Sequence, residues 1–77
     1  MLFLIEYDRD KGEVVSIRRF NTLHKSEADA TRLNLELDLN RRGIEHEVVV
    51  LEASNEDALR RTHRRYFENL SELVKAS

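Results

Sequence analysis

The sequence contains no cysteine and no proline, and only two glycines among its 77 residues. Without cysteine there can be no disulfide bond, no thiol nucleophile, no zinc–cysteine site and no iron–sulfur cluster. Two isolated glycines also exclude a glycine-rich phosphate-binding loop. Because the three histidines are scattered along the chain, we expect no structural metal site and no cofactor.

The chain also lacks a long apolar run. Its opening apolar stretch, residues 1–5, ends at Glu6 and is far too short to span a membrane or to form a signal-peptide core. We therefore expect a cytoplasmic protein. The net charge is −2, and no region is an acidic tail or a basic arm, so the sequence does not imply a general electrostatic attraction to nucleic acid.

The short length limits how much apolar surface the chain can bury. A domain of this size buries only about 60% of the surface that its unfolded chain exposes, so its margin of stability is small. Proteins of this size are often stabilised by disulfides, by a metal or by a partner subunit. We expect one domain over residues 1–77, with close packing or self-association as the source of additional stability.

The pattern of apolar and polar residues predicts three strands. Residues 2–7 are apolar on both alternating faces, as in a central strand, whereas residues 13–20 are more polar, as in an edge strand. The polar residues between them end in Gly12 and predict a hairpin turn. The third strand lies within residues 44–53 and is centred on Val48–Leu51.

Two helices are predicted from apolar spacing and end signals. The first covers residues 26–42, with Ser26 as N-cap and Gly43 as the C-terminal stop. The second covers residues 56–74, with Ser54 or Asn55 as N-cap. Its expected apolar face is made of Leu59, Tyr66, Phe67, Leu70, Leu73 and Val74.

These elements predict an α+β fold of order β-β-α-β-α. Because the first strand is the most apolar, we place it in the middle of a three-stranded, mainly antiparallel sheet of order 2-1-3. The alternative places the third strand parallel to and beside the second. We expect both helices to pack on one face of the sheet, which leaves the other face with uncovered apolar side chains.

The first predicted helix carries more leucine than one buried face requires. Leucine alternates with polar residues from Leu33 to Leu39, which is a strand signal, but the end signals and the many strong helix formers favour a helix. At about 100° per residue, two apolar stripes then form on roughly opposite sides. One is Ala30, Leu33 and Leu37, and the other is Ala28, Leu35 and Leu39.

A helix on a small monomer needs only one apolar stripe, so the second one requires a partner. We predict that Ala28, Leu35 and Leu39 form a self-association interface. Glutamate at positions 35 and 39 is then expected to dissociate a homodimer without unfolding the chain.

Four arginines lie within six residues of the second predicted helix, at Arg60, Arg61, Arg64 and Arg65. Guanidinium groups bind phosphate oxygens in two-point geometry, so this cluster is a candidate site for a phosphate ligand or a nucleic acid. The alternative is a solvated helix face, because Glu56 and Asp57 each precede an arginine by four residues. We favour the solvated face.

The histidines do not indicate catalysis or metal binding. His46-Glu47 matches only the first half of the zinc motif H-E-x-x-H, since position 50 is valine and the segment is a predicted strand. His63 lies among apolar positions of the second predicted helix, where a histidine bonded to a neighbouring carbonyl or carboxylate is the simplest interpretation.

Our hypothesis is therefore a small non-enzymatic protein that acts as a homodimer or as a protein-interaction module. The alternative is nucleic-acid or phosphate-ligand binding through the arginine-rich second helix.

Overall fold

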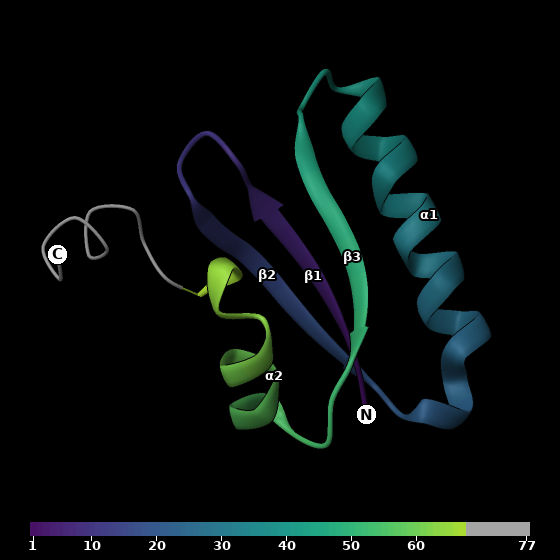
Figure 1. Cartoon of the computed structure of the whole chain (residues 1–77). Helices are drawn as coiled ribbons and strands as arrows, with labels where there is room; N and C mark the ends of the chain where they lie inside the picture. The colour runs from purple at the N-terminus through teal and green to yellow at the C-terminus, as the bar shows by residue number, and fades with distance from the viewer. Residues whose placement is uncertain (68–77) are drawn as a thin grey trace, which may run out of the picture.

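The computed structural model describes residues 1–67 (Figure 1). Its elements, in chain order, are β1 (Leu2–Asp8), β2 (Glu13–Phe20), a 3₁₀ turn (Thr22–His24), α1 (Lys25–Arg41), β3 (His46–Glu52), α2 (Glu56–Thr62) and a second 3₁₀ turn (Arg64–Tyr66). The fold is α+β, and the order of strands and helices is the predicted one.

The three strands form one antiparallel sheet of order β2-β1-β3, as predicted. Leu4 lies opposite Arg18 of β2 and Val50 of β3, so the most apolar strand is central. Gly12 closes the β1–β2 hairpin with a φ of +67°, a conformation that glycine adopts without a steric penalty. Its backbone N–H donates to the carbonyl of Asp8 at 2.8 Å.

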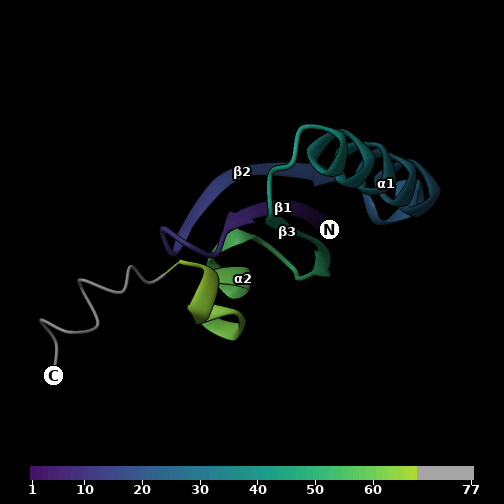
Figure 2. The same cartoon turned by 90° about the horizontal axis from the view of Figure 1, so that it is seen from above.

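The two helices cover opposite faces of the sheet, and the prediction that both pack on one face was wrong (Figure 2). On one face Leu39 of α1 packs with Leu4 and Val48. On the other face Leu59 of α2 packs with Phe3 and Ile5. The reason is the alternation in β1, because its even and odd residues are both apolar and each face needs a cover.

The first helix begins one residue earlier than predicted and without the predicted cap. Its N-cap position is His24, which makes no side-chain cap hydrogen bond, so Ser26 is not the cap. Asn21 instead caps the preceding 3₁₀ turn by accepting a hydrogen bond from the N–H of Leu23. At the other end Gly43 has a φ of +69° and stops the helix as predicted.

The second helix is much shorter than predicted. Asn55 is its N-cap and accepts a hydrogen bond from the N–H of Ala58, as expected. The helix ends at Thr62, because His63 leaves helical geometry with φ −125° and ψ 51°. The predicted apolar positions Leu70, Leu73 and Val74 lie outside the described residues.

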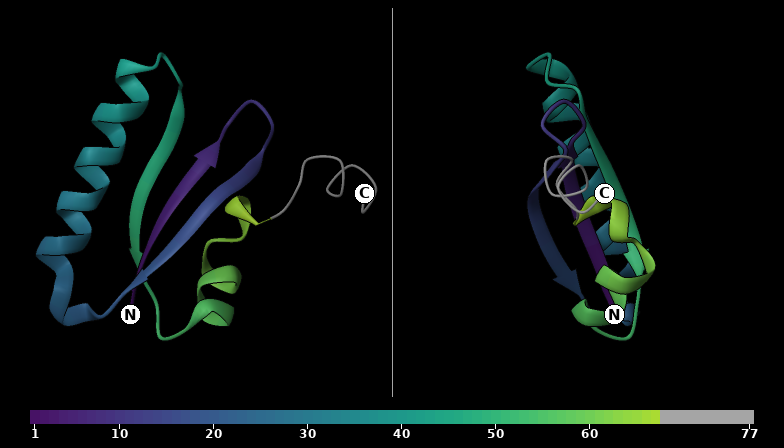
Figure 3. Two further views of the ribbon diagram at one scale, coloured as in Figure 1. Left: turned by 180° about the vertical axis from the view of Figure 1, so that it is seen from behind. Right: turned by 60° about the vertical axis from the view of Figure 1, so that its left-hand side comes forward.

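The outer strand β2 of the described sheet does not present a regular edge. The β1–β2 ladder shifts register between Glu6 and Tyr7, which leaves Val15 as an extra residue on β2. Arg18 and Arg19 add exposed charge to the same strand. Seen from the front and from behind, α1 lies alongside β3 (Figures 1 and 3). The bulge and the charges of β2 discourage further strand pairing at this edge.

Candidate functional site

The two apolar stripes of α1 have very different surroundings. Ala28 and Leu39 are buried, at 0% and 3% exposure, and Leu35 is half-buried against the same cluster on the sheet. Leu33 and Leu37 are 51% and 53% exposed. We call Ala30, Leu33 and Leu37 the outer stripe of α1, because they point away from the sheet.

This placement reverses the predicted roles of the two stripes. Leu35 and Leu39 pack against the chain's own sheet and Ala28 is buried, so these three residues do not form an exposed surface for self-association. At the helix end the N–H of Ile44 donates to the carbonyl of Leu39 at 2.9 Å, and the Ile44 side chain packs against the same cluster as Leu39. Glutamate at positions 35 and 39 is therefore expected to disrupt the fold.

The predicted arginine cluster is divided among several structural contacts. Arg60 donates to Glu56 at 3.1 Å, and its guanidinium lies 4.6 Å from the centre of the Phe67 ring. Glu56 also accepts a hydrogen bond from Arg19 of β2 at 2.7 Å. Arg61 and Arg64 are exposed on the surface of the same segment. The four arginines therefore do not converge on one shared point.

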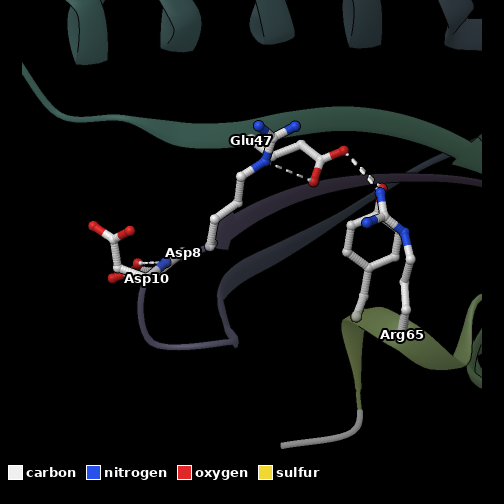
Figure 4. A network of polar contacts seen from close by, with 6 residues as sticks. Asp8, Asp10, Glu47 and Arg65 are labelled. Carbon is white, nitrogen blue, oxygen red and sulfur yellow. Dashed lines mark hydrogen bonds and ion pairs between the residues drawn. The ribbon is translucent and has the colours of Figure 1, made fainter. Parts of the chain in front are cut away.

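Arg65 belongs to a separate network centred on Glu47 of β3 (Figure 4). It donates to the Glu47 carboxylate at 3.0 Å and to the Tyr66 hydroxyl at 2.6 Å, and that hydroxyl in turn donates to Glu47 at 3.1 Å. Arg9 approaches the second Glu47 oxygen from the hairpin at 3.5 Å. The Tyr66 ring packs edge-on against Tyr7 at 5.1 Å. The network thus fastens the end of the described chain to the sheet.

The electrostatics of this network favour the charged form of Glu47, whose side chain is only 15% exposed. Burial raises the pKa of Glu47, but the Tyr66 hydroxyl and the guanidinium groups of Arg65 and Arg9 outweigh it and hold the pKa below its usual value of 4.5. Burial and the Glu47 carboxylate together raise the pKa of Tyr66. The tyrosine therefore remains a protonated donor at neutral pH.

A second polar contact joins β1 and β3 near the hairpin. His46 Nδ1 lies 2.6 Å from a Glu6 carboxylate oxygen, and His46 Nε2 lies 3.5 Å from Asp8. This contact was not predicted from the sequence. The signal was the i, i+2 spacing of Glu6 and Asp8, which puts both on one face of β1, where the strand pairing sets Asp8 opposite His46. No group of three acidic or histidine side chains within residues 1–67 could hold a metal ion.

His63 marks the end of α2. Its Nδ1 lies 2.9 Å from the Thr62 hydroxyl, and its backbone N–H donates to the carbonyl of Leu59 at 2.9 Å.

A shallow hollow of about 440 Å³ has Val14, Ile17 and Phe67 in its lining, and Arg60 and Glu13 add charge to it. Arg60 belongs to α2 and Glu13 to β2, and His63 is not part of the lining.

No known protein family, curated protein or solved structure matches this chain. Among the described residues, no helix has the length and apolar character needed to cross a membrane.

Proposed function

We propose that this protein is a non-enzymatic protein-interaction module and that the outer stripe of α1 is its contact surface. The supporting observation is the contrast between the two sides of one helix. Leu39 is 3% exposed on the inner side, whereas Leu33 and Leu37 are about half exposed on the outer side. Large exposed apolar side chains that are adjacent on a rigid helix are characteristic of a docking surface.

The polar networks of the structure have a structural role, which leaves the apolar outer stripe as the candidate for binding. Glu47, Arg65 and Tyr66 bond to one another, and His46 bonds to Glu6, so these groups stabilise the sheet and the segment after α2. Each is engaged by a neighbour of opposite charge or complementary hydrogen bonding. By contrast, Leu33 and Leu37 of the outer stripe remain about half exposed. Burying this surface is favourable by roughly 25 cal/mol per Å² of apolar area.

Site-specific photo-cross-linking in cells of the source organism tests this proposal. A photoreactive side chain at Asn34, which is exposed beside Leu33, is expected to form covalent adducts with a bound protein. The double variant Leu33→Glu and Leu37→Glu is expected to remove these adducts, because it would bury two carboxylates in the contact.

The matched control places the same photoreactive group at Val15 of β2, which is 52% exposed. We expect no adduct there. Adducts of equal yield at both positions, or adducts at Asn34 that persist in the double leucine variant, would contradict the outer stripe as the contact surface.

Binding of an anion through the arginine-rich segment is the alternative proposal. Arg60 and Arg65 are each held by a carboxylate, so a phosphate group would have to compete with Glu56 and Glu47. If the segment binds RNA or DNA, reversing the charge of Arg61 and Arg64 to glutamate should weaken binding and reduce its salt dependence. A fluorescence titration with a labelled oligonucleotide at low and high salt measures this. Equal binding by the charge-reversed variant would exclude these arginines.

A further inference from the structure

We propose that the partner of the outer stripe is a second copy of this chain, bound through antiparallel packing of α1 against α1. This inference rests on the proposed function and names its partner. It is carried by two features of α1 on the outer side: the spacing of the exposed leucines, and the complementary charges that flank them at the two ends of the helix.

The spacing is self-complementary under a two-fold axis. Residues 30, 33 and 37 follow one another at intervals of three and four, so they line up along one side of the helix. When two such helices run antiparallel with the axis midway between Leu33 and Leu37, Leu33 of each copy lies level with Leu37 of the other. Ala30 then lies level with Asn40, where its small side chain lets the helices approach closely.

Opposite charges meet on one flank of this pairing. Glu27, Asn34 and Arg41 are spaced by seven residues and lie along one side of the outer stripe. In an antiparallel pair like flanks face each other, so Glu27 of each copy faces Arg41 of the other, displaced by two residues or about 3 Å along the axis. The two-fold axis makes this ion pair twice.

These two side chains are available for the contact. Both are exposed, and Arg41 has no polar partner among residues 1–67. Glu27 has only a distant contact, 3.9 Å from His24. By contrast the neighbouring Arg42 is engaged by Asp38 within its own helix at 2.9 Å. Arg41, which lacks a partner within its own helix, can therefore pair with a carboxylate of a second copy.

The opposite flank carries an unfavourable pair, because the two copies of Glu36 approach each other near the axis. Each Glu36 is already bonded to Arg32 of its own helix at 3.0 Å, which reduces the repulsion. Pairing through the sheet edges is the competing geometry. The register shift and the arginines of β2 oppose it at that edge of the sheet.

The contact is smaller than a standard interface. One face of a seventeen-residue helix contributes less than the roughly 800 Å² per partner that stable complexes bury. We therefore expect a dimer that dissociates on dilution, with the monomer dominant at low micromolar concentration.

Sedimentation equilibrium of the purified full chain tests the geometry. Glu27→Arg and Arg41→Glu are each expected to weaken the dimer about tenfold, because two attractive pairs become repulsive. The double variant with both changes restores opposite charges and is expected to dimerise nearly as well as the wild type. Lys11→Glu, an exposed charge reversal in the hairpin, is the matched control and should change nothing.

Both single variants also oppose the helix dipole, and the double variant carries both penalties. Its recovery therefore cannot come from a more stable helix. A double variant as weak as the singles overturns the antiparallel pairing, and so does a wild-type chain that stays at 9.1 kDa at high micromolar concentration. In the cross-linking experiment, carried out with the chain at high micromolar concentration, adducts that contain another protein would overturn self-association while supporting the outer stripe, whereas absence of any adduct would overturn the proposed function itself.

Discussion

Replacing Leu39 by alanine is expected to lower the free energy of unfolding by about 2–5 kcal/mol. Leu39 is 3% exposed and packs with Leu4 and Val48, so truncation removes buried apolar surface and leaves a cavity. Replacing Leu37, two residues earlier and 53% exposed, should change the free energy by less than about 0.5 kcal/mol. The two substitutions have the same chemistry, so their difference measures burial alone.

Urea denaturation followed by circular dichroism provides the measurement. It should be carried out at low micromolar concentration, so that loss of a dimer contact at Leu37 does not contribute. For a chain of this size a loss of 2–5 kcal/mol is a large part of the total stability, which is roughly 5 kcal/mol. Similar losses for both variants would contradict the assignment of inner and outer sides of α1.

Much of the fold follows from local signals in the sequence. The apolar run of β1 identified the central strand, and the two glycines marked the hairpin and the end of α1, where their φ values are +67° and +69°. Asn55 was recognised as the cap of α2. Each of these signals acts within a few residues and depends on one backbone requirement, so it can be read without tertiary contacts.

The roles of the leucine stripes could not be derived in the same way. Both stripes contain one alanine and two leucines, so their apolar content does not rank them. Tertiary contacts distinguish them, because Leu39 packs with Leu4 and Val48 and Ile44 joins the same cluster. The covering of both sheet faces could have been predicted, since Phe3 and Leu4 of the central strand point to opposite sides.

The Glu47 network illustrates contacts that depend on a break in a helix. Glu47 and Arg65 are 18 residues apart in the chain. Had α2 continued past Thr62, helical spacing would have placed Arg65 beside Arg61 on the outer surface. The change of backbone direction at His63, with φ −125°, brings Arg65 and Tyr66 onto β3 instead. A periodic pattern that extends beyond His63 conceals this change.

Replacing Glu47 by glutamine is expected to lower the free energy of unfolding by about 1–2 kcal/mol at neutral pH, because Tyr66, Arg65 and Arg9 lose a charged acceptor. The folded-state pKa of Glu47 lies below 4.5, so the folded chain binds this proton less readily than the unfolded chain. Its stabilising contribution is therefore complete above about pH 5 and is lost as the pH falls through the folded pKa.

The difference between wild type and Glu47→Gln isolates this group, since the other carboxylates are common to both proteins. We expect urea denaturation to give a difference that is constant from pH 5 to 7 and shrinks toward zero at lower pH. Glu45→Gln removes an exposed carboxylate two residues earlier and should show little difference at any pH. A difference for Glu47→Gln that persists at acid pH would mean that glutamine perturbs the packing of Tyr66, and that the carboxylate charge does not hold this segment on the sheet.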